Sequence, residues 1–223
     1  QGLDVPDLPL ALATQTVRGE EATTVKVDMR LDVGRGSAGQ APVRYAAAIL
    51  GRNGEPLLET GAIAADAGAG AATARLTAQL APGPYRLRVA AVDADRRAGA
   101  LDVPFVAGLR TVAGLQASDV IVGGPTAAPA LHVEAGASLE AALELTTAEV
   151  ERFARAAVAF ELHGDSLPAP VLVEASLQPT NFERQRIARA AVATEGLAPG
   201  EYTLSAILTA DGVPAGRIPG HVV

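Results

Sequence analysis

One short phrase occurs twice in this chain and limits what the chain can fold into. Residues 80–85 read LAPGPY, and residues 197–202 read LAPGEY. After each phrase, hydrophobic and polar residues alternate, which is typical of a half-buried antiparallel strand. The interval between the two copies is close to the ~100 residues of one β-sandwich domain. We therefore expect a duplicated domain, not a solenoid of short repeats.

A second pair of alternating segments supports the duplication. The alternation runs through residues 25–33 and again through residues 138–146, upstream of each LAPG phrase by a similar distance. We therefore predict an all-β protein of two tandem immunoglobulin- or fibronectin III-like β-sandwiches. The first would span residues 1–108 and the second residues 109–223, with a linker around 107–116.

The repeated phrase itself is interpreted as a tyrosine corner. In immunoglobulin-like and fibronectin III-like sandwiches, a Tyr at the start of a strand hydrogen-bonds the backbone a few residues upstream. The proline of each phrase fixes φ and the glycine tolerates a positive φ, so the chain can turn sharply between the sheets. The predicted corner residues are Leu80, Pro82, Gly83 and Tyr85 in the first copy, and Leu197, Pro199, Gly200 and Tyr202 in the second.

The remaining strands are expected at short spacing. In the first unit they are 10–18, 23–33, 43–51, 56–64, 72–80, 84–93 and 99–106. In the second unit they are 117–123, 129–135, 138–146, 157–163, 171–177, 184–194, 201–209 and 215–222. Asn53-Gly54 and Asp211-Gly212 predict hairpin turns. Thr146 with Glu149 resembles a capping box and predicts one short helix in the second unit.

Composition excludes several classes of protein. Hydrophobic residues make up 49% of the 223 residues but aromatics only 3%, so the cores must consist of small aliphatic side chains. The absence of cysteine excludes disulfides, thiol catalysis and cysteine-based zinc sites. A net charge of -7 argues against a nucleic-acid partner. No apolar run approaches the ~18 residues of a membrane span.

A glycine pattern resembles a cofactor-binding motif. Gly34, Gly36 and Gly39 match G-x-G-x-x-G, the dinucleotide-binding fingerprint. That fingerprint requires a helix that begins at the glycines, whereas Pro42 and a strand-like segment follow here. We interpret residues 34–39 as a loop and expect no cofactor.

A second motif resembles an esterase block. Residues 164–167 read GDSL, as around the nucleophile of a known esterase family, in which a D-x-x-H block supplies the other members of the triad. Here Ile218 stands three positions before His221, so the partner block is missing. Without a base the Ser166 hydroxyl is not activated, and a polar turn is the favoured interpretation.

Metal-binding residues are sparse. His132, His163 and His221 form no closely spaced pair, so we expect no metal site. Asp93 and Asp95 could offer oxygen ligands to Ca²⁺ at a sandwich tip. Arg96 and Arg97 follow at once and would oppose a cation, so solvated turn charges are favoured there. The sequence leaves this calcium site open.

Several stretches together resemble the C-terminal, immunoglobulin-like region of secreted bacterial proteins related to von Willebrand factor A, of acidobacterial type. They are Asp7 to Ala13, Tyr45 to Glu55, the LAPGPYRLRVAAVD segment from Leu80, and LQASDVIVGG at 115–124. The A domain's metal-binding D-x-S-x-S motif does not occur in this chain. The resemblance therefore implies a tail of sandwich modules in an exported protein, at the cell surface, in the periplasm or secreted.

We accordingly expect a non-catalytic spacer or interaction module, whose partners are other proteins or neighbouring domains of its own chain. One alternative is a structural filament subunit that assembles through sheet edges or through a donor arm formed by residues 1–9. A second alternative is an esterase that uses Ser166. The N-terminal residues lack a signal-peptide pattern and begin with Gln, so we expect a processed product or a piece of a longer protein.

Overall fold

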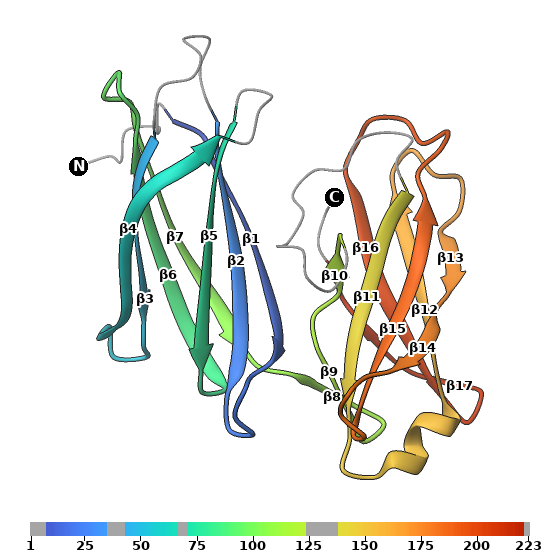
Figure 1. Ribbon diagram of the computed structural model, residues 1–223. Coiled ribbons are helices and arrows are strands. Elements are labelled where there is room, and N and C mark those ends of the chain that lie inside the picture. Colours follow the sequence, from blue (N-terminus) through green and yellow to red (C-terminus); the bar gives the residue numbers. More distant parts are fainter. Residues whose placement is uncertain (1–7, 35–42, 67–70, 124–137, 221–223) are drawn as a thin grey trace.

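The computed structural model describes residues 8–34, 43–66, 71–123 and 138–220 of the chain. These residues form strands β1 to β17 and one short 3-10 helix, η1. Two sandwiches of antiparallel sheets lie side by side, and the chain passes once from the first to the second between β7 and β8 (Figure 1). The predicted all-β fold of two tandem sandwiches is thus confirmed.

In the first sandwich, one strand passes from one sheet to the other. Its strands are β1 (Leu10–Arg18), β2 (Val25–Gly34), β3 (Val43–Leu50), β4 (Pro56–Asp66), β5 (Ala71–Leu80), β6 (Gly83–Val92) and β7 (Ala98–Ala107). They follow the order β1-β2-β5-β4-β3-β6-β7. Most of β4 pairs with β3, but its last two residues, Ala65 and Asp66, pair with β5. Strand β4 therefore joins the two sheets at one side of the sandwich.

The second sandwich repeats this plan with the joining strand divided. One sheet contains β8 (Arg110–Val112), β9 (Leu115–Ala117), β10 (Ile121–Val122), β11 (Ser138–Thr146), β14 (Ser176–Pro179) and β15 (Gln185–Ala193). The other contains β12 (Ala156–Gly164), β13 (Val171–Glu174), β16 (Tyr202–Ala210) and β17 (Val213–Ile218). The change of sheet falls at Ala175, whose N–H donates to the Val158 carbonyl at 2.8 Å. The single strand predicted for 171–177 is therefore two strands.

Each sandwich has its own hydrophobic core, because alternate residues of both sheets point inward. Met29, Leu31, Ile49 and Leu87 are among the largest fully buried side chains of the first. The second core is built around Phe160, with Leu143, Leu204 and Leu208 among its other members. The two clusters of buried side chains share no residue.

The junction and the helix differ from expectation. Residues 110–117 form the hairpin β8–β9, and β9 pairs with β11, so most of the linker expected at 107–116 belongs to a sheet of the second sandwich. One short helix is present as predicted, the 3-10 helix η1 (Val150–Arg155), but Glu149 is its N-cap, not Thr146. Thr147 accepts the Glu149 N–H at 3.1 Å instead. The strand expected at 129–135 lies outside the described residues.

Candidate functional site

Both tyrosines of the repeated phrase turn back onto the chain that precedes them. The Tyr85 hydroxyl donates to the Ala81 carbonyl at 2.7 Å, and the Tyr202 hydroxyl donates to the Ala198 carbonyl at 2.6 Å. A hydrogen bond from the ring to the backbone a few residues upstream is the contact that defines a tyrosine corner. Tyr202 is buried, whereas Tyr85 is half-buried and stacks on Phe105.

The corner glycines do not use the positive φ that glycine tolerates. The positive-φ glycines are Gly54, Gly114, Gly123, Gly196 and Gly212, and neither Gly83 nor Gly200 is among them. A Cβ on Gly83 or on Gly200 would lie 3.8 Å from the ring of its tyrosine, an ordinary contact. The positive φ near the second corner belongs to Gly196, at 80°, which precedes the repeated phrase.

Ser166 belongs to the second corner. Its Oγ lies 2.7 Å from the Tyr202 hydroxyl oxygen. Because the Tyr202 proton is directed to Ala198, Ser166 must be the donor in this pair. No histidine or carboxylate within the described ranges hydrogen-bonds Ser166, and His163 points away from the core on an exposed position of β12. Within these ranges, the geometry gives Ser166 a structural contact with Tyr202.

The turn between β6 and β7 is closed by an ion pair. Asp93 accepts the Arg97 backbone N–H at 2.9 Å and its Nε–H at 2.7 Å. Burial acts to raise the pKa of Asp93, but the hydrogen bonds and the charge of Arg97 outweigh it and hold that pKa below its ordinary value. Asp93 thus has a cationic partner already, and the parts of the chain that the structure describes contain no cluster of three or more metal-ligating residues.

The free edge of β1 is met by the second sandwich. The Asp119 N–H donates to the Thr16 carbonyl at 2.9 Å, and the Asp119 carboxylate accepts the Thr16 N–H at 2.8 Å. One residue of the second sandwich therefore satisfies both the donor and the acceptor of Thr16, as a paired strand would. Asp119 is held in place by Ser118, whose hydroxyl donates to its carbonyl at 2.7 Å.

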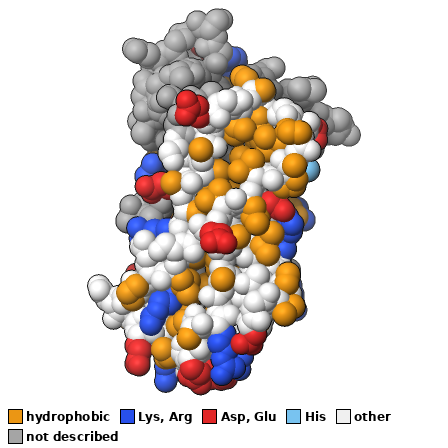
Figure 2. Space-filling model, turned by 90° about the vertical axis from the view of Figure 1, so that its right-hand side faces the viewer, with side chains coloured by type: hydrophobic (Ala, Val, Ile, Leu, Met, Phe, Trp, Pro, Cys, Tyr) orange, Lys and Arg blue, Asp and Glu red, His pale blue; other side chains and the backbone are white. Residues whose placement is uncertain are grey.

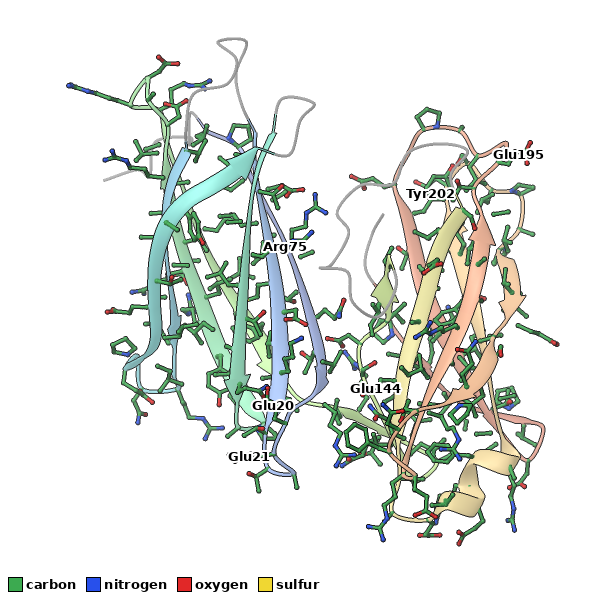
Figure 3. The ribbon with its side chains drawn as sticks, in the orientation of Figure 1. Glu20, Glu21, Arg75, Glu144, Glu195 and Tyr202 are labelled. Carbon is green, nitrogen blue, oxygen red and sulfur yellow. The ribbon has the colours of Figure 1, made fainter. Side chains whose placement is uncertain are left out.

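Glu144 makes a similar contact with β1 two residues further along the strand, at Arg18. Its Oε2 accepts the Arg18 N–H at 3.1 Å, and its backbone is bonded to Ser118 in both directions. Figure 3 shows Glu144 on the side of the second sandwich that faces the first. Burial raises the pKa of Glu144, although the Arg18 hydrogen bond and the charges of Arg18 and Lys26 act to lower it.

The outer face of β1, next to this hydrogen-bonded edge, is buried as well. Ala13 and Gln15 are 3% and 2% exposed, although their side chains alternate with Leu12 and Thr14 and point away from the first core. We call Thr16, Arg18, Asp119 and Glu144 the junction. The sequence does not mark any of the four as functional, because a carboxylate that completes a distant strand edge leaves no local pattern. Asp119 appears above only as part of the segment 115–124, which resembles the von Willebrand factor A-related proteins.

A second surface feature lies on the other side of the first sandwich. A hollow of about 1000 Å³ opens on the outer face of the sheet formed by β4, β3, β6 and β7. Its floor includes Ala46, Gly61, Ala90 and Ala100, which are paired with one another across four strands. Because these side chains are so small, the face is depressed where most sheets are covered by longer side chains.

The fold and these sites together define a tandem β-sandwich protein whose two sandwiches are joined by hydrogen bonds at the junction. Compared with known proteins, the chain matches no protein-family model and no curated protein. In the described part of the chain, no helix is both long enough and apolar enough to span a bilayer.

Proposed function

We propose that the chain is a non-catalytic module of two immunoglobulin-like sandwiches that holds other parts of an exported protein at a fixed separation. The observation that carries this proposal is the junction. Two sandwiches joined only by a linker would move freely, whereas here the edge of β1 is hydrogen-bonded to Asp119 and Glu144 at three places. A fixed angle between domains is what a spacer requires.

The short connection supports the same role. Strand β7 ends at Ala107 and β8 begins at Arg110, so only Gly108 and Leu109 separate a strand of the first sandwich from a strand of the second. Two residues allow little independent motion once both neighbours are fixed in sheets. The immunoglobulin-like assignment is supported by the two corners, and the exported location by the resemblance to von Willebrand factor A-related tails.

Assembly through sheet edges is less well supported. Three of the edge strands contain a proline: Pro104 in β7, Pro179 in β14 and Pro214 in β17. Proline lacks the N–H that an added strand would require, and natural sheets use it to blunt their edges. The proposed donor arm is also occupied at its end, because Leu8 is fully buried and its N–H donates to the Ala98 carbonyl.

The absence of cysteine makes a direct test simple. Arg52 and Glu183, exposed positions in the first and second sandwich, are each changed to Cys and spin-labelled. Pulsed electron paramagnetic resonance should give one narrow distribution of distances between the two spin labels if the spacer is rigid. Asp119→Ala should broaden it, whereas Asp95→Ala, an exposed turn carboxylate outside the junction, should not. A broad distribution in the parent protein would contradict the proposal.

A further inference from the structure

The hollow on the first sandwich lies among charged groups with a small surplus of positive charge. Arg86 and Arg88 share a single carboxylate, Asp102, at 2.8 and 3.1 Å. Arg44, two residues before Ala46 on the same face of β3, has no ion-pair partner within the described residues. Glu59 is the one further charged residue that lines the hollow. Three arginines and two carboxylates leave this face locally positive in a chain whose net charge is -7.

The opposite end of the molecule presents the complementary features. Leu172 on β13 is 59% exposed, because it alternates with Val171 and Val173, which pack against the second core. Glu174 follows on the same face of β13 and has no ion-pair partner among the residues described. Figure 2, which looks onto this end, shows hydrophobic side chains gathered over its upper part, with both acidic and basic side chains around them.

The net negative charge of the chain is also distributed unevenly between its two halves. Residues 1–108 contain eleven Lys or Arg and twelve Asp or Glu, whereas residues 109–223 contain seven and thirteen, of the 18 and 25 in the chain. The first sandwich is nearly neutral and the second carries nearly all of the excess negative charge. The positively charged hollow and the acidic, apolar end lie at opposite ends of one molecule (Figure 1). They can therefore meet only when they belong to different copies of the chain, and their opposite charges then favour the contact.

We propose that the chain associates with a second copy of itself head to tail, with Leu172 of one copy seated in the alanine- and glycine-floored hollow of the next. Glu174 then approaches Arg44 and Arg88 of the receiving copy. Small side chains let an exposed leucine reach the sheet, and the surplus positive charge beside the hollow meets a carboxylate that has no partner of its own. The contact uses sheet faces, so the edge prolines do not oppose it.

A head-to-tail contact is heterologous: each copy gives one surface and receives with the other, so association continues beyond a dimer or closes into a ring. This goes beyond the proposed spacer role, and it does not require that the spacer be rigid. Sedimentation of the parent protein up to near-millimolar concentration should show species larger than a dimer that increase with concentration and decrease with added salt.

Two variants test the assignment of the surfaces. Ala90→Glu fills the hollow and places a negative charge where Glu174 would lie, and Leu172→Glu removes the apolar contact. Both positions are exposed, so both variants should fold, as circular dichroism would check. Each variant alone should be monomeric. Mixed together, they should form a dimer and nothing larger, because one intact hollow and one intact Leu172 remain.

Matched controls separate this result from a general effect of added charge. Val213→Glu changes a hydrophobic residue that is 64% exposed elsewhere on the second sandwich, and Ala191→Glu changes an exposed alanine of β15. Neither should alter association. If either test variant unfolds, Ala100→Glu and Leu172→Ser replace it. A parent protein that stays monomeric at every concentration overturns the proposal, as does a dimer that the mixed variants fail to restore.

Discussion

The carboxylate of Asp119, in the second sandwich, accepts the backbone N–H of Thr16, in the first, at 2.8 Å. Thr16 is 2% exposed, so its N–H has no access to bulk water that could replace Asp119. Asp119→Ala should therefore destabilise the docked arrangement by about 1–3 kcal/mol, the cost of leaving a buried donor unpaired. Urea denaturation should show this as a loss of coupling between the unfolding of the two sandwiches, whereas Asp95→Ala should leave the coupling unchanged.

The contribution of Glu144 to stability should depend on pH with the opposite sign to that of most carboxylates. Its pKa is raised by burial, so the docked protein binds this proton more tightly than the unfolded chain does. Its contribution to stability is fully present below the ordinary value of 4.5 and is lost as the pH rises through the raised pKa. We expect Glu144→Gln, which keeps an acceptor for Arg18, to gain stability relative to the parent protein as the pH rises from 4 to 7.

Asp93 should behave in the opposite way. Burial acts to raise its pKa, but the contacts with Arg97 outweigh this, so the pKa is lowered overall. The Asp93–Arg97 pair then stabilises the first sandwich above the ordinary pKa of aspartate, and this contribution is lost as the pH falls through the lowered value. Asp93→Asn should destabilise the parent near neutral pH and make little difference in strong acid. Thermal melts at a series of pH values would reveal a constant difference if this is wrong.

The two tyrosine corners should differ in strength. Tyr202 is buried and its hydroxyl both donates to Ala198 and accepts from Ser166, whereas Tyr85 makes one bond and is half-buried. Tyr202→Phe should cost about 1–3 kcal/mol, because it removes two hydrogen bonds made by a buried hydroxyl, and Tyr85→Phe, which removes one, about 0.5–1.5 kcal/mol. Urea denaturation of both variants gives the comparison; equal losses would show that the Ser166 contact adds nothing.

The glycines around the second corner give a sharper test of packing. A Cβ on Gly164 would lie 2.4 Å from the Tyr202 ring, whereas a Cβ on Gly200 would lie 3.8 Å from it. Gly164→Ala should therefore displace the ring and destabilise the second sandwich by about 1–3 kcal/mol. Gly200→Ala should be neutral or slightly stabilising, since its φ is not positive and alanine restricts the unfolded chain. Thermal melts of the two variants that do not differ would contradict this account.

Much of the fold could be read from the sequence because its signals are local. Residues 10–18 were predicted as a strand and form β1 with the same bounds, and residues 138–146 likewise form β11. Alternation along these segments reflects which side chains face a core, and each segment carries that pattern by itself. The repeated phrase likewise placed Tyr85 and Tyr202 at strand starts, since a turn and the strand that follows are adjacent in sequence.

Other features of the corners could not be read from the sequence. Gly83 and Gly200 tolerate a positive φ, but the chain turns without it at both positions, and a Cβ at either would make only an ordinary contact with the tyrosine ring. Ser166 resembled a nucleophile in its tetrapeptide, yet its partner is Tyr202, 36 residues away. The neighbour that holds Ser166 is brought there by the fold.

Local signals along the chain specify the strands, their duplication and the position of the corners, since period-2 hydrophobicity and turn residues act over a few positions. The completion of the β1 edge by Asp119 and Glu144, and the depression formed by Ala46, Gly61, Ala90 and Ala100, arise only when the strands pair and the two sandwiches dock. The physical reason is that hydrogen bonds across 103 residues, and alignment across four strands, depend on register and docking, which no short segment encodes.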